Sequence, residues 1–350
     1  MTDVAEIQLS SELFLNKSTI LYGVTKSGKS KVIRNILRVL NPDISQVIVI
    51  CPSDPATGEY SADGLIASPC IHYTFDLELL KEIFNRNEMM ASCYNKANNI
   101  KLLYEIIQKT GIVNSIQPFI NKMEQIRYSS IQSVMDRYSC DFGKRSSEIK
   151  KINDEFDKTT RKLYKTFIRK HKKSIDINSL SQDCQYCIKY LDFNPGMVMI
   201  WDDCGSILSS IQKKDRQIVN DYFIRNRHAM ITTIVAVQGD KSVHKDLRGN
   251  AFNSIFTDPI TAKSFFDYRE NQIDSVLRKR AHECIDLHFH DYQKLLYVRE
   301  DREFYRFTAQ VFTGLKIGSP SLLDFCERIK SKQNSIDKSN KYYHFFGLDH

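Results

Sequence analysis

The residues with the clearest chemical potential form a glycine-rich run near the amino end of the chain. This run matches the pattern G-x-x-x-x-G-K-[ST] of a phosphate-binding loop, in which backbone N–H groups surround the phosphates of a nucleotide. The side chain of Lys29 would reach the β- and γ-phosphates, and Ser30 would offer its hydroxyl group to Mg²⁺. The expected nucleotide-binding residues are Gly23, Val24, Thr25, Lys26, Ser27, Gly28, Lys29 and Ser30. An ordinary glycine-rich turn without a ligand is the alternative interpretation.

The segments on either side of this run are those that a phosphate-binding loop requires. Apolar residues at 18–24 predict a buried strand, and residues 31–40 carry apolar side chains at helical spacing. The helix would begin at the loop, so that the positive end of its dipole faces the phosphates. A second apolar run follows at residues 46–52. The three segments together predict a strand–helix–strand unit with parallel strands.

Two acidic residues follow another apolar run, where enzymes with this loop carry a metal-binding carboxylate. Residues 197–201 predict a buried strand, and Asp202 and Asp203 come directly after it. We expect Asp202 to bind Mg²⁺ beside the loop. Asp203 would orient and polarise an attacking water molecule. The alternative is that the two acids only cap the helix that follows the strand.

A glutamine and two arginines flank the next apolar run, residues 231–237. Gln238 would lie at the carboxyl edge of a buried strand, where open α/β sheets bind ligands, and could contact the γ-phosphate or position water. Arg225 and Arg227 precede the strand, and either could act as an arginine finger that stabilises transition-state charge. The alternatives are a loop hydrogen bond for the glutamine and a surface position for the arginines.

The order of apolar and polar segments predicts an α/β fold, with a mostly parallel central sheet flanked by helices and a long helical insertion. The expected parts are residues 1–76 and 191–330 as the two halves of the core, 77–190 as the helical, basic insertion, and 331–350 as a tail. The later elements are expected to be a helix at 211–224, a strand at 253–257, helices within 261–284, and a closing hairpin or edge strands at 293–299 and 303–309.

The positive charge of the chain is concentrated in one segment. The chain has 50 basic and 42 acidic residues, a net charge of +8, and residues 143–173 alone hold twelve basic and four acidic residues. Such a field is typical of a protein that binds DNA or RNA, although a solvated helix face shows the same pattern. The expected DNA contacts are Lys162, Lys165, Arg169 and Lys170.

Length and composition narrow the class of protein. With 350 residues, of which 42% are hydrophobic and 26% charged, the chain can form a core and is neither collagen-like nor wholly disordered. Its first residues do not resemble a secretory signal, and its apolar runs are shorter than the ~18 residues of a membrane helix. Nine scattered cysteines suit reduced thiols. We therefore expect an intracellular protein with no transmembrane segment.

Two groups of metal-type residues are weaker signals. Cys184 and Cys187 have the C-x-x-C spacing of zinc ligands, but no second pair follows at finger spacing. A second group contains His282, Cys284, His288 and His290. Free thiols and ordinary core or surface histidines are the preferred interpretation of both groups.

The motifs, taken in their order, resemble those of one family. The segments GVTKSGKS, IWDD, RNRHAMITTIVAVQ and LRGNAFNSIF are similar to those of the poxvirus-type genome-packaging ATPases of large cytoplasmic DNA viruses, within the FtsK/HerA superfamily. The resemblance covers residues 18–51 and 197–307 and does not extend to residues 77–190. The phosphate-loop motif is shared by many families, and the ordered set is more specific.

This resemblance implies an ATPase that uses ATP and Mg²⁺ to move double-stranded DNA into a viral particle. It implies that Asp203 and Gln238 are catalytic, beside the Lys29 already expected from the loop motif. It also implies that Arg227 acts on the nucleotide of a neighbouring subunit, with Arg225 as the alternate finger. It also implies that the strand before Gln238 lies between the loop strand and the strand that ends in the two acids. Arg248 and Asn250 match a family motif without an assigned role.

The resemblance further implies a homo-oligomeric ring around DNA, a possible capsid or membrane protein as partner, and a location in the host cytoplasm (viral factory) or in the virion. Two other functions remain open. A small-molecule kinase would use the same loop but transfer the phosphoryl group to an acceptor hydroxyl. A nucleotide-gated structural subunit would keep Lys29 and Asp202 but would not need Asp203.

Overall fold

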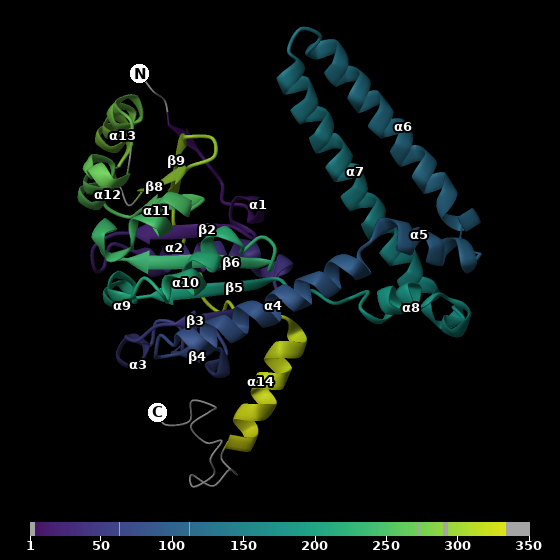
Figure 1. Cartoon of the computed structure of the whole chain (residues 1–350), viewed down its shortest axis with the longest axis horizontal. Coiled ribbons are helices and arrows are strands. Elements are labelled where there is room, and N and C mark those ends of the chain that lie inside the picture. Colours follow the sequence, from purple (N-terminus) through teal and green to yellow (C-terminus); the bar gives the residue numbers. More distant parts are fainter. Residues whose placement is uncertain (1–3, 63, 112, 272, 290–292, 334–350) are drawn as a thin grey trace. The chain divides into compact units, whose positions relative to one another are not determined.

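The computed structural model describes residues 4–62, 64–111, 113–271, 273–289 and 293–333. These residues form a nine-stranded sheet with the order β1-β9-β8-β7-β2-β6-β5-β3-β4 (Figure 1). The strands are β1 (Ala5–Glu6), β2 (Ser18–Tyr22), β3 (Gln46–Ile50), β4 (Ile71–His72), β5 (Met197–Asp202), β6 (Ile231–Val237), β7 (Asn253–Phe256), β8 (Gln293–Val298) and β9 (Glu303–Thr308). Only β7–β8 and β8–β9 are antiparallel pairs among the described strands. The expected mostly parallel α/β fold is therefore confirmed.

Strands β2, β6 and β5 lie next to one another in the sheet, with β6 between the other two. This is the order that the family resemblance implied. Every residue of the three strands is buried. Their side chains alternate between two cores, since Ile20 and Tyr22 join one core and Leu21 joins the other. A strand that is buried on both faces has a continuous apolar sequence, which is why these strands could be predicted.

Helices cover both faces of the sheet. The helix α2 (Lys29–Leu40) contributes Val32, Ile33, Ile36 and Leu37 to one core, because these residues recur at helical spacing. The other core contains side chains of α10 (Arg216–Ile224), α11 (Lys245–Asn250), α12 (Pro259–Asp267) and α13 (Ser275–His288). The result is a three-layer arrangement with the sheet in the middle.

The helix expected at residues 211–224 is shorter than predicted. The structure has α9 (Gly205–Ser210) and then α10, which begins only at Arg216. Ile211 is buried at the end of α9, and a turn follows it, so the apolar residue that suggested one helix belongs to the connection. The expected strand at 253–257 and the closing hairpin are confirmed as β7 and as the pair β8–β9.

The remaining short elements complete the sheet-containing unit, which comprises Met1–Ala91 and Asn194–His350. They are α1 (Ser11–Phe14), α3 (Asp54–Thr57), α14 (Pro320–Gln333) and 3₁₀ helices at Asn41–Asp43, Ser68–Cys70, Asp240–Ser242 and Arg269–Asn271. Of the tail expected at 331–350, residues 334–350 lie outside the described residues.

A second unit comprises Ser92–Phe193 and is helical. Its helices are the end of α4 (Leu77–Ala97), α5 (Ile100–Lys109), α6 (Val113–Arg137), α7 (Phe142–His171) and α8 (Gln182–Lys189), with 3₁₀ helices at Lys172–Ser174 and Ile177–Ser179. It has its own apolar core, which includes Ile106, Tyr164 and Ile168. No helix in the described part of the chain is both long and apolar enough to cross a membrane.

Candidate nucleotide site

The predicted phosphate-binding loop connects the carboxyl end of β2 to the first turn of α2. Gly28 has φ +95° and directly precedes α2. Glycine adopts this left-handed conformation without strain. At the other end of the loop, a Cβ atom on Gly23 would lie 1.8 Å from Oγ1 of Thr257, so this position accepts only glycine. The two glycines therefore let the chain turn closely against the sheet and present the amino end of α2, which favours bound anions.

The side chain of Lys29 lies folded onto its own loop. Its Nζ donates hydrogen bonds to the carbonyl oxygens of Gly23 at 2.7 Å and of Val24 at 3.2 Å. Burial lowers the pKa of Lys29, and three nearby carboxylates act in the opposite direction. These carboxylates belong to Asp202, Asp203 and Asp258. Lys29 is thus close to several acids, and its bonds to the carbonyl oxygens can be exchanged for bonds to phosphate oxygens.

The carboxylate of Asp202 is buried at the end of β5. Its Oδ2 accepts a hydrogen bond from the hydroxyl group of Tyr60 at 2.8 Å, and its Oδ1 accepts one from the N–H of Asp203 at 3.0 Å. Burial raises the pKa of Asp202 to about 6, although the hydrogen bond from Tyr60 works against this shift. A carboxylate kept from water in this way is a strong candidate for a cation ligand, because a bound cation would offset the cost of its burial.

Asp203 is exposed and has the left-handed φ of +55°. Aspartate tolerates this conformation better than most residues, and the strand ends there. The hydroxyl group of Ser53 donates a hydrogen bond to Oδ2 of Asp203 at 2.5 Å. Ser53 therefore orients the carboxylate to which the sequence assigned the attacking water. No motif signalled Ser53 or Tyr60, because both act through contacts that are distant in the sequence.

Gln238 directly follows β6 and is exposed. Its strand pairs with β2 on one side and β5 on the other, so the residue follows a strand that lies between the loop strand and the strand of Asp202. Gln238 and Asp203 both line one cavity of about 460 Å³. The cavity is also lined by Gly205, Ser206, Ser209, Val237, Lys241 and Ser242. The two predicted catalytic residues thus face the same space.

Three residues without a motif signal contact the loop, two from the segment after β7 and one from β8. Oγ1 of Thr257 lies 2.5 Å from Oγ of Ser27, and Asp258 accepts a hydrogen bond from the N–H of Val24 at 3.0 Å. Lys294 donates to the carbonyl oxygen of Ser27 at 2.9 Å. Two signals could have drawn attention to them. Asp258 comes shortly after a buried strand, as Asp203 does, and Lys294 places a charge directly before an apolar run.

The two candidate finger arginines precede β6, at the opposite end of the strand from Gln238. Arg225 is engaged within its own chain, because its guanidinium pairs with Glu88 at 2.5 Å and Asp221 at 3.5 Å. Arg227 is exposed, and its Cζ lies 5.0 Å from the ring centroid of Phe252. Both side chains are exposed, but the guanidinium of Arg225 is already paired with two carboxylates.

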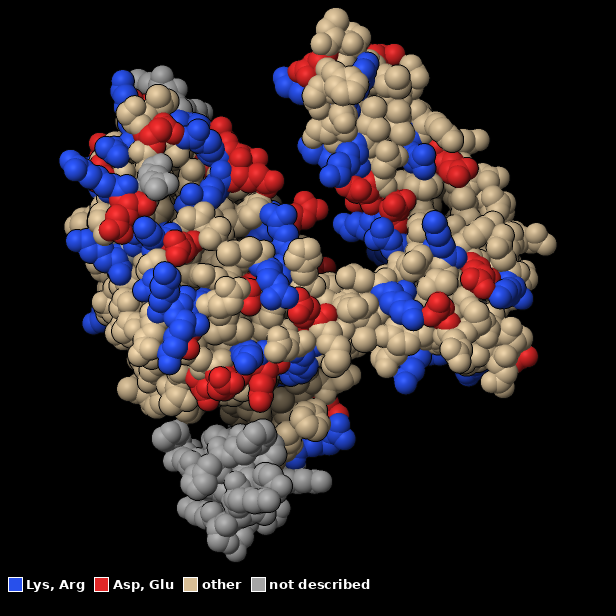
Figure 2. All heavy atoms as spheres, viewed as in Figure 1, with Lys and Arg blue, Asp and Glu red and all other residues tan. Residues whose placement is uncertain are grey.

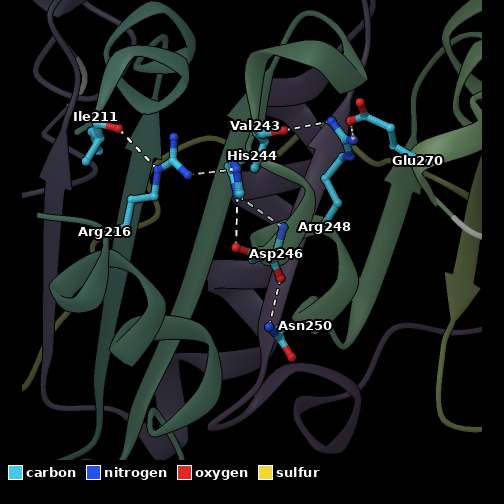
Figure 3. Close-up of polar contacts among 8 residues, drawn as sticks. All are labelled: Ile211, Arg216, Val243, His244, Asp246, Arg248, Asn250 and Glu270. Carbon is cyan, nitrogen blue, oxygen red and sulfur yellow. Dashed lines mark hydrogen bonds and ion pairs between the residues drawn. The ribbon is translucent and has the colours of Figure 1, made fainter. Parts of the chain in front are cut away.

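Arg248 and Asn250, the unassigned motif residues, lie in α11. The buried guanidinium of Arg248 donates to the carbonyl oxygen of Val243 at 2.7 Å and pairs with Glu270 at 3.4 Å (Figure 3). Asn250 donates to the carbonyl oxygen of Asp246 at 2.8 Å within the same helix. These contacts give Arg248 a structural role, since it joins α11 to the 3₁₀ helix that contains Glu270.

The four expected DNA contacts lie on α7 and differ in accessibility. Nζ of Lys165 donates to the amide oxygen of Asn98 at 2.9 Å, and burial lowers the pKa of this lysine. Arg169 pairs with Asp192 at 2.5 Å. Lys162, Arg169 and Lys170 are exposed, whereas Lys165 is half-buried. Basic atoms recur along α7 with acidic atoms between them (Figure 2), so the positive field of this helix is partly offset by its own acids.

The weaker metal-type groups lie in different settings. Cys184 and Cys187 are both buried in the apolar core of the second unit. His282 pairs with a carboxylate of α12 at 2.8 Å, whereas the side chain of His288 and the whole of His290 lie outside the described residues. Among the residues that the structure describes, no cluster of three or more His, Cys, Asp or Glu side chains could hold a metal ion.

Replacing Asp202 with asparagine should make the metal-free protein more stable at pH 8. The neutral amide avoids the burial of a charge. Its oxygen can accept from the N–H of Asp203 and its nitrogen can donate to the Tyr60 hydroxyl oxygen, but the Tyr60 proton then loses its acceptor, which offsets part of the gain. We expect the free energy of unfolding, measured by urea titration in EDTA, to rise by about 1–3 kcal/mol. The gain should shrink as the pH falls toward about 4, where the wild-type carboxylate takes up a proton.

Asp203→Asn is the matched control, because this neighbouring carboxylate is exposed and its replacement should leave the unfolding free energy nearly unchanged. An Asp202→Asn protein that is no more stable than wild type at pH 8 would show that the burial of this carboxylate carries no cost.

The comparisons with known proteins identify relatives over almost the whole chain. The protein is 30% identical over 364 residues to protein B354L of African swine fever virus, from a Kenyan pig isolate. The match covers 99% of this chain and 97% of B354L. No family model matches the chain.

Solved structures are similar at a lower level. The genome packaging NTPase B204 from Sulfolobus turreted icosahedral virus 2, in complex with ATP-gammaS, is 13% identical; the match covers 83% of this chain and 95% of B204, with a TM-score of 0.39. The pCW3 conjugation coupling protein TcpA is 12% identical over 90% of this chain and 66% of TcpA, with a TM-score of 0.41. Likeness at this level transfers no activity to the chain. The B354L match does establish kinship, and the protein belongs to the family of the African swine fever virus protein B354L.

Proposed function

We propose that this protein is an ATP-driven translocase of double-stranded DNA, which hydrolyses ATP with Mg²⁺ and packages a viral genome into the particle. The observation that carries the ATPase is that the loop of Lys29, Asp202 and Gln238 come at the carboxyl ends of three adjacent parallel strands. The DNA part rests on the basic helix α7 and on the motifs that resemble packaging ATPases. Kinship with viral proteins supports a location in an infected cell or in the virion.

The residues beside the loop fit a bound Mg²⁺. This ion prefers oxygen ligands and is commonly held by one or two carboxylates together with substrate phosphates. Asp202 offers a buried carboxylate, and Ser30 offers a hydroxyl group on the first turn of α2. When bound there, Mg²⁺ would neutralise the charge of the phosphate oxygens. Asp202 and Ser30 are therefore the residues that we propose hold it.

The other site residues bind the nucleotide and prepare the water molecule. Lys29 would leave the carbonyl oxygens of its own loop and donate to phosphate oxygens, which attract an ammonium more strongly. Asp203 would accept a hydrogen bond from the attacking water, with its carboxylate oriented by Ser53. Gln238 would contact the γ-phosphate or the same water, because it lines the cavity together with Asp203.

The position of Arg227 supports a role between subunits. Arg227 precedes β6, and Gln238 follows this strand. The strand has seven residues of about 3.3 Å each, so its two ends are roughly 20 Å apart. An arginine side chain cannot span this distance to reach its own nucleotide. We therefore propose that Arg227 acts on the nucleotide of a neighbouring copy in a homo-oligomeric ring around DNA. A capsid or membrane protein is the proposed docking partner of this ring.

ATP turnover by the whole chain, with and without double-stranded DNA, tests the proposed function. DNA should stimulate turnover, whereas transfer of phosphate to an added nucleoside would indicate a kinase. Negligible turnover in both conditions would indicate a structural subunit.

Lys29→Ala should abolish hydrolysis without unfolding the protein, because this side chain contacts the loop and not the cores. Lys213→Ala, which alters an exposed lysine, is the matched control.

The same assay separates the two acids. Asp203→Asn should lower the rate by ~10² to 10⁴ while ATP still binds, because only the water-orienting carboxylate is lost. Asp202→Asn should also weaken Mg²⁺-dependent nucleotide binding. Normal turnover by Lys29→Ala or by Asp203→Asn would remove this assignment of the active site.

Neutral replacements on α7 test the DNA part. Changing Lys162, Lys165, Arg169 and Lys170 together to glutamine should weaken binding to double-stranded DNA and flatten the plot of log affinity against log salt. The slope should fall by up to ~0.9 for each phosphate contact that is lost. Most of the change should come from Lys162 and Lys170, since the other two have partners in the protein. An unchanged slope would mean that α7 is only a solvated surface.

Mixed oligomers test the role of Arg227 in trans. Arg227→Ala should lose turnover yet bind ATP, because an arginine finger acts on transition-state charge and is worth ~10³ to 10⁵ in rate. Mixing it with Lys29→Ala subunits should restore some activity, since a mixed ring pairs an intact loop with an intact finger. His228→Ala, at the exposed neighbouring position, should behave like wild type. A mixture that stays inactive, although mixed oligomers form, would exclude the finger in trans.

A further inference from the structure

A buried lysine on β8 holds the phosphate loop from its far side. Lys294 is only 6% exposed. Its Nζ donates hydrogen bonds to the carbonyl oxygen of Ser27 at 2.9 Å and to that of Thr257 at 3.1 Å. Ser27 belongs to the loop, and Thr257 directly follows β7. One ammonium group thus joins the loop to two strands that lie beyond β2 in the sheet.

The burial of this charge is costly. Burial lowers the pKa of Lys294, the carboxylate of Asp258 acts against this shift, and the nearby Lys31 adds to it. An apolar side chain of similar volume, such as methionine, would fill the same space without the cost of removing an ammonium group from water. Packing alone therefore does not explain a lysine at this position.

The contact with Ser27 fixes the orientation of one peptide group in the loop. The carbonyl group of Ser27 and the N–H of Gly28 belong to the same planar peptide, and in a trans peptide they point in opposite directions. Because Lys294 of β8 donates to the carbonyl oxygen of Ser27, the N–H of Gly28 is directed away from β8. A Cβ atom on Gly28 would lie 3.7 Å from Nζ of Lys294, which shows how close the ammonium group lies to this peptide.

The beginning of the loop is held in a similar way. Asp258 accepts a hydrogen bond from the N–H of Val24 at 3.0 Å, and its other oxygen accepts one from the N–H of Thr261 at 2.9 Å. The hydroxyl group of Thr257 bonds to that of Ser27. The segment after β7 and Lys294 therefore support both ends of the loop before any ligand binds. Such preorganisation lowers the cost of ordering the loop around a ligand.

We propose that Lys294 is a positioning residue for nucleotide binding. It holds the Ser27 carbonyl group so that the N–H of Gly28 faces the bound phosphates, and its charge adds to the positive potential at the amino end of α2. This inference rests on the proposed nucleotide site and adds a residue to it that lies outside the loop motif. Lys294 contacts the loop and acts through it.

The test compares nucleotide affinity and turnover for the whole chain and its Lys294→Met variant. A hydrogen bond that involves a charged group is worth enough to change affinity by about 10- to 100-fold. We expect calorimetry to show losses of this size for both ATP and ADP, with KM rising in step and kcat changing much less. Lys294→Arg should recover part of the affinity, because a guanidinium can donate to both carbonyl oxygens. Lys213→Met is the control for an exposed lysine.

A thermal melt establishes that each variant is folded at the assay temperature. Lys294→Gln is the second variant if Lys294→Met does not fold. The glutamine amide is shorter and neutral and cannot donate to both carbonyl oxygens, so the loss of ATP and ADP affinity should be of the same kind but smaller. Unchanged affinity for ADP in a folded Met or Gln variant would overturn the proposal. A wild-type chain that binds ADP and ATP without hydrolysis would instead contradict only the proposed function.

Discussion

The parallel pairing of β6 with β2 on one side and β5 on the other is the constraint on which the candidate site depends. Val237 pairs with Tyr22, and Ala236 pairs with Asp202, so three polar segments begin at the same edge of the sheet. A slip of one residue would turn every side chain of β6 to the opposite face. Because both faces of β6 are buried, the apolar contacts that hold this register also hold the site together.

The candidate site contains buried charged side chains that do not stabilise the ligand-free protein. Asp202 and Lys294 are both buried. Burial raises the pKa of Asp202 and lowers that of Lys294, so it favours the neutral form of each side chain. Lys29 shows the same effect. The apolar layers on both faces of the sheet supply the stability that offsets these costs. A nucleotide with its cation would bring the opposite charges, so its binding should also stabilise the folded chain.

The sequence predicted those parts of the site that depend on local pattern. Continuous apolar runs indicated the central strands, and the spacing of Gly23, Gly28 and Lys29 indicated the loop, because these signals lie within a few neighbouring residues. Tyr60 and Lys294 were missed, since their roles arise from contacts with residues that are 142 and 267 positions away. The start of the helix expected at 211–224 was wrong for a related reason, since α10 begins only at Arg216. Ile211 is buried directly after α9, and it does not belong to α10.

The polarity of the sheet also constrains any assembly in which Arg227 completes the site of another copy. Arg227 lies before β6 and the phosphate loop lies after β2, and these two strands run parallel. The edge that would donate the arginine is therefore the opposite edge from the one at which we propose that the nucleotide binds. An interface between two different surfaces is heterologous and cannot close as a twofold dimer. Repetition of such a contact gives either a closed ring or an open helical array. A motor that surrounds DNA requires the closed form, so the angle between neighbouring copies is as essential to the proposed function as the chemistry of the loop.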